Sequence, residues 1–189
     1  MSNLRFVALV CSLLASACSP PPGPVVMDCH GEQHAPLAVA GDAVHVVVFI
    51  SHECPIANGY APTLRTLQEA WSRDSRVQLF LVHVDPDLSA EQALVHAKDY
   101  ELPGTLLMDP TQVLAKECGA TITPEAVVVR ASGIAYRGRI DDQWRKLGSR
   151  APQASQNDLA DAVANVLAGK PVAQPFPKAV GCLLPEPRD

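Results

Sequence analysis

The feature that most constrains the fold is a mostly β-branched apolar run over residues 44–50, in which His45 is the one polar residue. Such a run without polar alternation is typical of a strand buried on both faces of a sheet that helices cover. The next residues predict a helix over 56–72, because Leu64, Leu67 and Trp71 recur at helical spacing. Pro62 lies inside this segment, so we expect a kink there. The core therefore begins with a buried strand followed by a helix.

Later segments alternate between strand and helix patterns. Strands are predicted at 77–84 and 105–108, helices at 89–100 and 111–118, a hairpin over 126–129 and 134–140, and a last helix from Ser155. Parallel strands need crossover helices, whereas the hairpin adds antiparallel strands. We therefore expect an α/β protein, a three-layer sandwich in which helices cover both faces of a mixed central β-sheet. Residues 28–169 form this domain.

The first 17 residues predict a secretory signal peptide. Arg5 precedes an apolar run over 6–17 that ends in Ala15-Ser16-Ala17, the small-residue pattern of a cleavage site. The run is too short to span a membrane, which takes about 20 apolar residues. Cys18 follows directly and resembles the lipidated cysteine of bacterial lipoproteins. We expect an exported periplasmic or cell-envelope lipoprotein; the alternative is a secreted soluble protein cleaved after Ala17.

Proline-rich segments flank the predicted domain. Residues 18–27 are expected to be an extended tether, and residues 170–189 an irregular tail that carries Cys182. The net charge is −5 and the basic residues are scattered, which argues against a nucleic-acid partner. Membrane contact is expected only through a lipid on Cys18.

Four cysteines remain beyond Cys18, at positions 29, 54, 118 and 182. Export permits disulfides, and the sequence alone does not choose among the pairings. Cys54 has the setting of a reactive thiol, because it lies where the buried strand gives way to a helix. Free N–H groups and the partial positive charge of a helix N-terminus stabilise a thiolate, which is the nucleophilic form. Cys54 is therefore the candidate nucleophile.

The segment Cys54-Pro55-Ile56-Ala57, followed by Tyr60-Ala61-Pro62, resembles the active-site helix of the thioredoxin-like superfamily. That family has a proline eight residues after its first active-site cysteine, and Cys54 and Pro62 hold these two places. Thr121-Ile122-Thr123-Pro124 is similar to the family's cis-proline loop, which lies against the active cysteine. The resemblance runs from Val44 to Leu167. It implies catalytic roles for Cys54 and Pro124 and substrate contacts for Pro55 and Thr123.

An additional helix between the second and third strands resembles the redoxin (AhpC/TSA, peroxiredoxin-like) branch. Peroxiredoxins have a hydroxyl residue three positions before their nucleophile, and Ser51 holds that place as a catalytic candidate. Pro124 stands where their peroxide-binding arginine would be, so Arg137 or Arg139 could replace it only if the fold brings them near. The loop after the hairpin lies beside the active cysteine in such folds. Arg139 and Asp141 are therefore candidates for substrate contact, with a solvated loop as the equal alternative.

The site departs from thioredoxin at Ala57, which takes the place of the second active-site cysteine. A disulfide-forming cycle therefore needs another thiol. Cys182 is our candidate, because its tail can move without unfolding the core. The alternatives are a structural Cys29–Cys182 bridge and a free tail thiol.

Three functions follow from these patterns. The first is an exported thiol-dependent oxidoreductase, without a cofactor, that acts through Cys54 on a disulfide of a partner protein or on a peroxide. The second is a Cu(I) module that resembles the Sco proteins, although Asn58 replaces their second cysteine and no histidine follows His96. Cys54 and Cys182 would then hold the soft ion. The third is a redox-silent thioredoxin-fold interaction domain.

Overall fold

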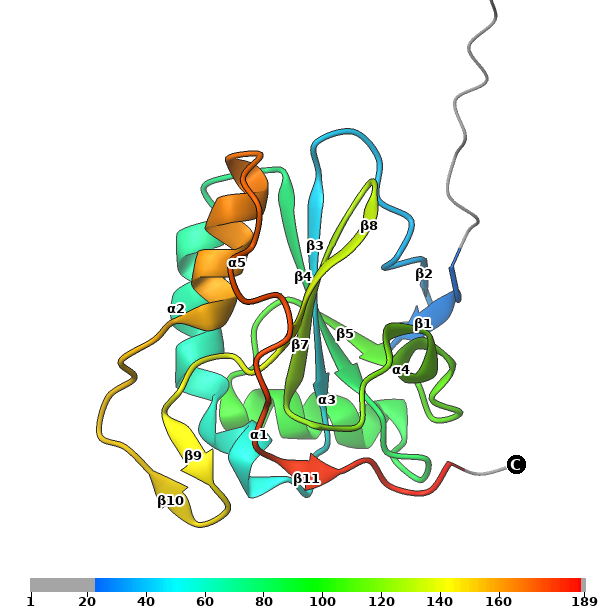
Figure 1. The fold of residues 1–189 in the computed structure, drawn as a ribbon. Helices are drawn as coiled ribbons and strands as arrows, with labels where there is room; N and C mark the ends of the chain where they lie inside the picture. The colour runs from blue at the N-terminus through cyan, green and yellow to red at the C-terminus, as the bar shows by residue number, and fades with distance from the viewer. Residues whose placement is uncertain (1–22, 188–189) are drawn as a thin grey trace, which may run out of the picture.

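The computed structural model describes residues 23–187, so the predicted signal peptide and Cys18 lie outside the described residues (Figure 1). The strands are β1 (Val26–Asp28), β2 (Gln33–His34), β3 (Val44–Ile50), β4 (Val77–His83), β5 (Thr105–Met108), β6 (Ile122–Thr123), β7 (Glu125–Arg130), β8 (Gly133–Gly138), β9 (Trp144–Lys146), β10 (Ser149–Arg150) and β11 (Cys182–Leu183). The helices are α1 (Pro55–Gly59), α2 (Ala61–Trp71), α3 (Ala90–Tyr100), α4 (Val113–Cys118) and α5 (Asp158–Leu167). Within residues 23–187, no helix combines the length and the apolar character that crossing a membrane requires.

The central sheet has seven strands in the order β2-β1-β5-β4-β3-β7-β8. β3, β4 and β5 run parallel, whereas β7 pairs antiparallel with β3, and β8 with β7. The mixed sheet expected from the sequence is therefore confirmed. β3 lies inside the sheet with a neighbour on each side, as its continuous apolar sequence predicts.

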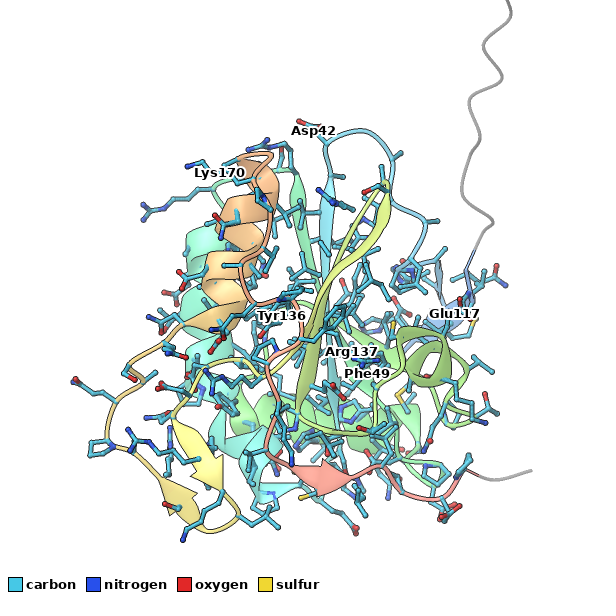
Figure 2. The ribbon with its side chains drawn as sticks, in the orientation of Figure 1. Asp42, Phe49, Glu117, Tyr136, Arg137 and Lys170 are labelled. Carbon is cyan, nitrogen blue, oxygen red and sulfur yellow. The ribbon has the colours of Figure 1, made fainter. Side chains whose placement is uncertain are left out.

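Helices cover both faces of this sheet and create two hydrophobic cores. Val46 and Val48 of β3 face a core formed with α1, α2 and α5, to which Tyr136 also belongs (Figure 2). Val47 and Phe49 face the opposite core, formed with α4 and the N-terminal segment. Successive side chains of β3 thus pack into two cores on opposite faces of the sheet. The expected three-layer sandwich is therefore confirmed.

The predicted helix over 56–72 is two helices rather than one kinked helix. α1 ends at Gly59, α2 begins at Ala61, and Pro62 lies in the first turn of α2. Proline fits a first turn because the N–H that it lacks would have no intrahelical acceptor there. The chain therefore restarts its helix at Tyr60, whose N–H donates to the Ala57 carbonyl at 3.0 Å.

Helix starts were predicted with mixed success. Ser89 caps α3 as expected, because its hydroxyl accepts the Gln92 N–H while the Gln92 side chain accepts the Ser89 N–H. The start at Ser155 was wrong: α5 begins at Asp158. The Ser155 hydroxyl instead donates to the Asp142 carboxylate.

Both proline-rich flanks contribute ordered structure. β1 pairs with β5 through Met27 and Met108, so the sheet already includes two residues that were assigned to the tether. The tail is bound along β8, where the Arg137 N–H donates to the Pro175 carbonyl at 2.9 Å. It then pairs through β11 with β6. The tail is therefore a fixed part of the domain rather than an irregular appendage.

Candidate active site

Cys54 connects β3 to α1 and is the N-cap residue of that helix. Its Sγ accepts the Ala57 N–H at 3.4 Å, and its side chain is almost completely buried. Pro55 occupies the exposed first position of α1, where its missing N–H leaves no orphaned donor. The local sequence thus directs one N–H group at the sulfur.

The loop before β7 lies against Cys54. The Thr123–Pro124 peptide bond is cis, as the resemblance implied. The Thr123 carbonyl oxygen lies 3.1 Å from Cys54 Sγ. The Thr123 side chain is completely buried, and its hydroxyl is among the groups that lower the pKa of Cys54.

The tail brings a second thiol to the same place. β11 runs antiparallel to β6 with Cys182 opposite Thr123, and the two sulfurs of Cys54 and Cys182 lie 2.8 Å apart. This approach depends on Gly181, because a Cβ there would lie 2.0 Å from the Thr123 carbonyl oxygen. Cys29 is elsewhere, with its Sγ 3.7 Å from Met108 Sδ. The structure therefore unites Cys54 with Cys182 and leaves Cys29 apart from both.

The two facing thiols differ in acidity. Burial raises the pKa of Cys54, but hydrogen bonds from the Cys182 thiol, the Ala57 N–H and Thr123 outweigh this effect and hold the pKa below its ordinary value. Burial, and then the neighbouring Cys54, raise the pKa of Cys182 to about 11. Cys54 is therefore the more acidic of the two facing thiols, and Cys182 the less acidic.

Ser51, the candidate catalytic hydroxyl, points away from this pair. Its Oγ donates to Asp85 Oδ1 at 2.5 Å and accepts the Glu53 N–H at 3.3 Å. Within residues 23–187, its hydroxyl contacts are to these groups rather than to Cys54 Sγ. Ser51 thus fixes the end of β3 to the loop after β4.

The two arginines that could replace a peroxide-binding arginine are held by other groups. Arg139 forms an ion pair with Asp158 at 2.8 Å, and Arg137 donates to the carbonyls of Cys118 and Gly119. Their guanidinium groups therefore stabilise α5 and the end of α4.

Asp141 is not part of a solvated loop, which corrects that alternative. Its side chain is buried and accepts the Tyr60 hydroxyl at 2.7 Å and the Gln143 N–H at 2.8 Å. Burial and the adjacent Asp141 raise the pKa of Tyr60, which therefore keeps its proton. The pair ties the junction of α1 and α2 to the chain after β8.

Sequence reasoning missed a buried polar cluster behind the active-site loop. Asp85 contacts His52 Nδ1 at 3.3 Å and His83 Nδ1 at 3.6 Å, and His96 Nε2 lies 2.9 Å from Asn58 Oδ1. Burial, and then His83 and His52, lower the pKa of His96 to about 4, so its ring is neutral at pH 7. His52 is only partly exposed. The sequence could have indicated this cluster, because His52 and His83 lie at the carboxyl ends of adjacent parallel strands, which share one edge of the sheet.

Comparison with known proteins supports the fold at the level of structure. No protein-family model matches the sequence, and no curated protein does. A Geobacillus kaustophilus protein described as uncharacterized is similar, with 24% identity and a TM-score of 0.74 over 89% of this chain and 90% of its own. A hypothetical protein of Sinorhizobium meliloti 1021 has 24% identity and a TM-score of 0.71 over 85% and 88%.

A third solved structure carries a functional description. It is a secreted Mycobacterium tuberculosis disulfide oxidoreductase homologous to E. coli DsbE, with 18% identity and a TM-score of 0.53 over 77% of this chain and 94% of that one. At these identities the likeness establishes the fold. The expected thioredoxin-like α/β fold is thereby confirmed.

Proposed function

We propose that the protein is a thiol–disulfide oxidoreductase in which Cys54 is the nucleophile and Cys182 its redox partner. The 2.8 Å separation of their sulfurs carries this proposal. The S–S bond of a disulfide is about 2.05 Å long, so only a small approach is needed to form one. The opposite pKa shifts of the two thiols assign their roles.

The reaction follows from these roles. The Cys54 thiolate attacks one sulfur of a protein disulfide, forms a mixed disulfide and expels the other sulfur as a thiolate. Cys182 loses its proton and attacks Cys54 Sγ, so the Cys54–Cys182 bond forms while the second substrate sulfur leaves as a thiolate. The substrate has then gained two electrons, and the two sulfurs of the oxidoreductase have lost them. The same steps in reverse oxidise a substrate dithiol.

Access to Cys54 requires the tail to move. Cys54 is buried, and Cys182 of β11 lies against its sulfur. β11 pairs with β6 over only two residues. Such a short pairing can open without disturbing the seven-stranded sheet. The tail is therefore both the source of the second thiol and the cover of the first.

A disulfide substrate is better supported than a peroxide. A peroxidase site would use a hydroxyl and an arginine near the sulfur, whereas Ser51, Arg137 and Arg139 are bound to other groups. Two facing thiols also suit Cu(I), which prefers soft ligands. Copper binding is thus the second candidate. A competition titration of the reduced protein with a Cu(I) chelator distinguishes it, because an oxidoreductase need not retain the ion.

The proposed location is an oxidising compartment outside the cytoplasm, in which a disulfide can persist. The motivation is the apolar run over 6–17 followed by Cys18. N-terminal analysis of the mature protein should find Cys18 first, blocked by lipid. A mature chain that still begins at Met1 would contradict export.

The function is tested by trapping the mixed disulfide. Cys182→Ser should accumulate a covalent adduct with a disulfide-bonded protein, because the second attack is lost. Cys54→Ser should form no adduct, and Cys118→Ala is the matched control that should turn over normally. Exchange at the wild-type rate by Cys54→Ser would refute the proposal.

A further inference from the structure

A groove of about 720 Å³ lies between the tail and the β9–β10 hairpin. Its lining includes Ile122 and Gly181, the neighbours of Thr123 and Cys182. Trp144 and Leu147 of the hairpin form one wall, and Val180 of the tail contributes to the other. α1, β11 and the hairpin lie at the same end of the molecule (Figure 1). The groove therefore reaches the residues next to Thr123 and Cys182, at the end of the molecule that carries the proposed reacting sulfurs.

The hairpin wall is held directly against the active-site helix. A Cβ on Gly59 of α1 would lie 3.1 Å from the Trp144 ring, so the indole packs on the α1 backbone. The Arg150 guanidinium stacks over the same ring at 5.6 Å. Side chains on this hairpin thus keep a fixed position relative to Cys54.

The groove is basic although the protein is acidic. Its lining has the basic side chains Arg139, Arg145, Lys146 and Lys178 and the acidic side chain Asp142. Arg139 is neutralised by Asp158, and Asp142 accepts hydrogen bonds from Ser155 and Gln156. The other three are exposed and form no ion pair with any residue among 23–187. In a chain of net charge −5, three unpaired basic side chains thus line this one groove.

Exposed apolar side chains lie near these basic side chains. Leu147, between β9 and β10, is 67% exposed, and Leu183, next to Cys182, is 82% exposed. An extended segment that reaches the sulfurs through the groove would pass both the basic side chains and Leu147. Opposite charges and apolar contact would then act on the same ligand.

We propose that this groove selects an extended segment of a partner protein with acidic residues flanking its redox-active cysteine. The inference rests on the proposed function and names its substrate class. Arg145 and Lys146 supply the specificity, because they lie on the hairpin wall that is fixed to α1. Charge complementarity acts mainly on association, so its effect belongs to kcat/KM and weakens with salt.

The test uses cysteine peptides of matched length, each linked by a disulfide to the same reporter thiol, with glutamate or lysine as flanking residues. Hydroxyethyl disulfide serves as an uncharged small substrate. The mature wild-type protein should favour the glutamate peptide by about tenfold or more in kcat/KM at low ionic strength, and less at high ionic strength. The double variant Arg145→Glu/Lys146→Glu should lose or reverse this preference.

The matched control is Arg73→Glu/Lys170→Glu, which changes the net charge equally at exposed positions outside the groove lining. Lys170 is labelled in Figure 2. This control should keep the preference, and the rate with hydroxyethyl disulfide, measured for all three proteins, divides out any change in the general reactivity of Cys54. Equal kcat/KM values for the two peptides, or a preference that the hairpin variant leaves unchanged, would overturn the inference while the function stands. Failure to react with hydroxyethyl disulfide would instead refute the function, and the inference with it.

Discussion

Cys54 and Cys118 are both buried cysteines at the ends of short helices, yet their thiols differ in acidity. Cys54 precedes α1, where an N–H group and two neighbouring side chains stabilise its thiolate and lower its pKa. Cys118 ends α4, where burial, and then Asp109 and Glu117, raise its pKa to about 12. Burial disfavours the charged form at both sites. The difference therefore arises from donors at one sulfur and carboxylates near the other.

Replacing Cys54 or Cys118 by alanine should give the largest difference between the two thiols. In the reduced protein, Cys54 should ionise below the ordinary thiol value, well before Cys118. A titration of the ultraviolet absorbance of thiolates should lose its lowest-pH step in Cys54→Ala and retain it in Cys118→Ala. A first step that survives in Cys54→Ala would show that another cysteine is the acidic one.

Gly181→Ala should separate the two sulfurs while both cysteines remain in the chain. The new Cβ would lie 2.0 Å from the Thr123 carbonyl oxygen, so β11 must leave β6. We expect the equilibrium constant for closing the Cys54–Cys182 disulfide in a glutathione buffer to fall by about tenfold or more, because the effective concentration of Cys182 drops.

Loss of the Cys182 donor should also raise the pKa of Cys54 in this variant. Glu186→Ala, an exposed change further along the same tail, is the control and should behave as wild type. An unchanged disulfide equilibrium in Gly181→Ala would contradict the role given to the β11–β6 pairing.

Thr123→Val should produce the smallest of these effects. It removes one hydroxyl that stabilises the Cys54 thiolate, so the pKa of Cys54 should rise and the alkylation profile should move to higher pH. Thr123→Ser should restore the wild-type profile because it retains the hydroxyl. If the alkylation profile of Thr123→Val moves to lower pH, or does not move, the Thr123 hydroxyl does not stabilise the Cys54 thiolate.

The sequence predicted the parts of the molecule that depend on neighbouring residues. The continuous apolar run of β3 identified a buried strand, and the pattern of strand and helix correctly placed Cys54 at the start of a helix. The cis bond before Pro124 followed from resemblance to a family, since most X-Pro bonds in folded proteins are trans.

Features formed by distant segments were not predictable in the same way. β11 is two residues long and exists because it pairs with β6, more than fifty residues earlier. The β9–β10 hairpin that forms the basic groove is equally short. Asp141 seemed an ordinary loop acid because its partner, the Tyr60 hydroxyl, lies 81 positions away. Such contacts leave no periodic pattern in the local sequence.

The most direct test of the central claim is the disulfide connectivity of the mature protein after mild oxidation. Free thiols are alkylated, the protein is digested without reduction, and the peptides are mapped by mass spectrometry. We predict one cross-linked pair that contains Cys54 and Cys182, with Cys29 and Cys118 alkylated. A Cys29–Cys182 cross-link with Cys54 alkylated would contradict the account and leave Cys54 as a one-cysteine centre.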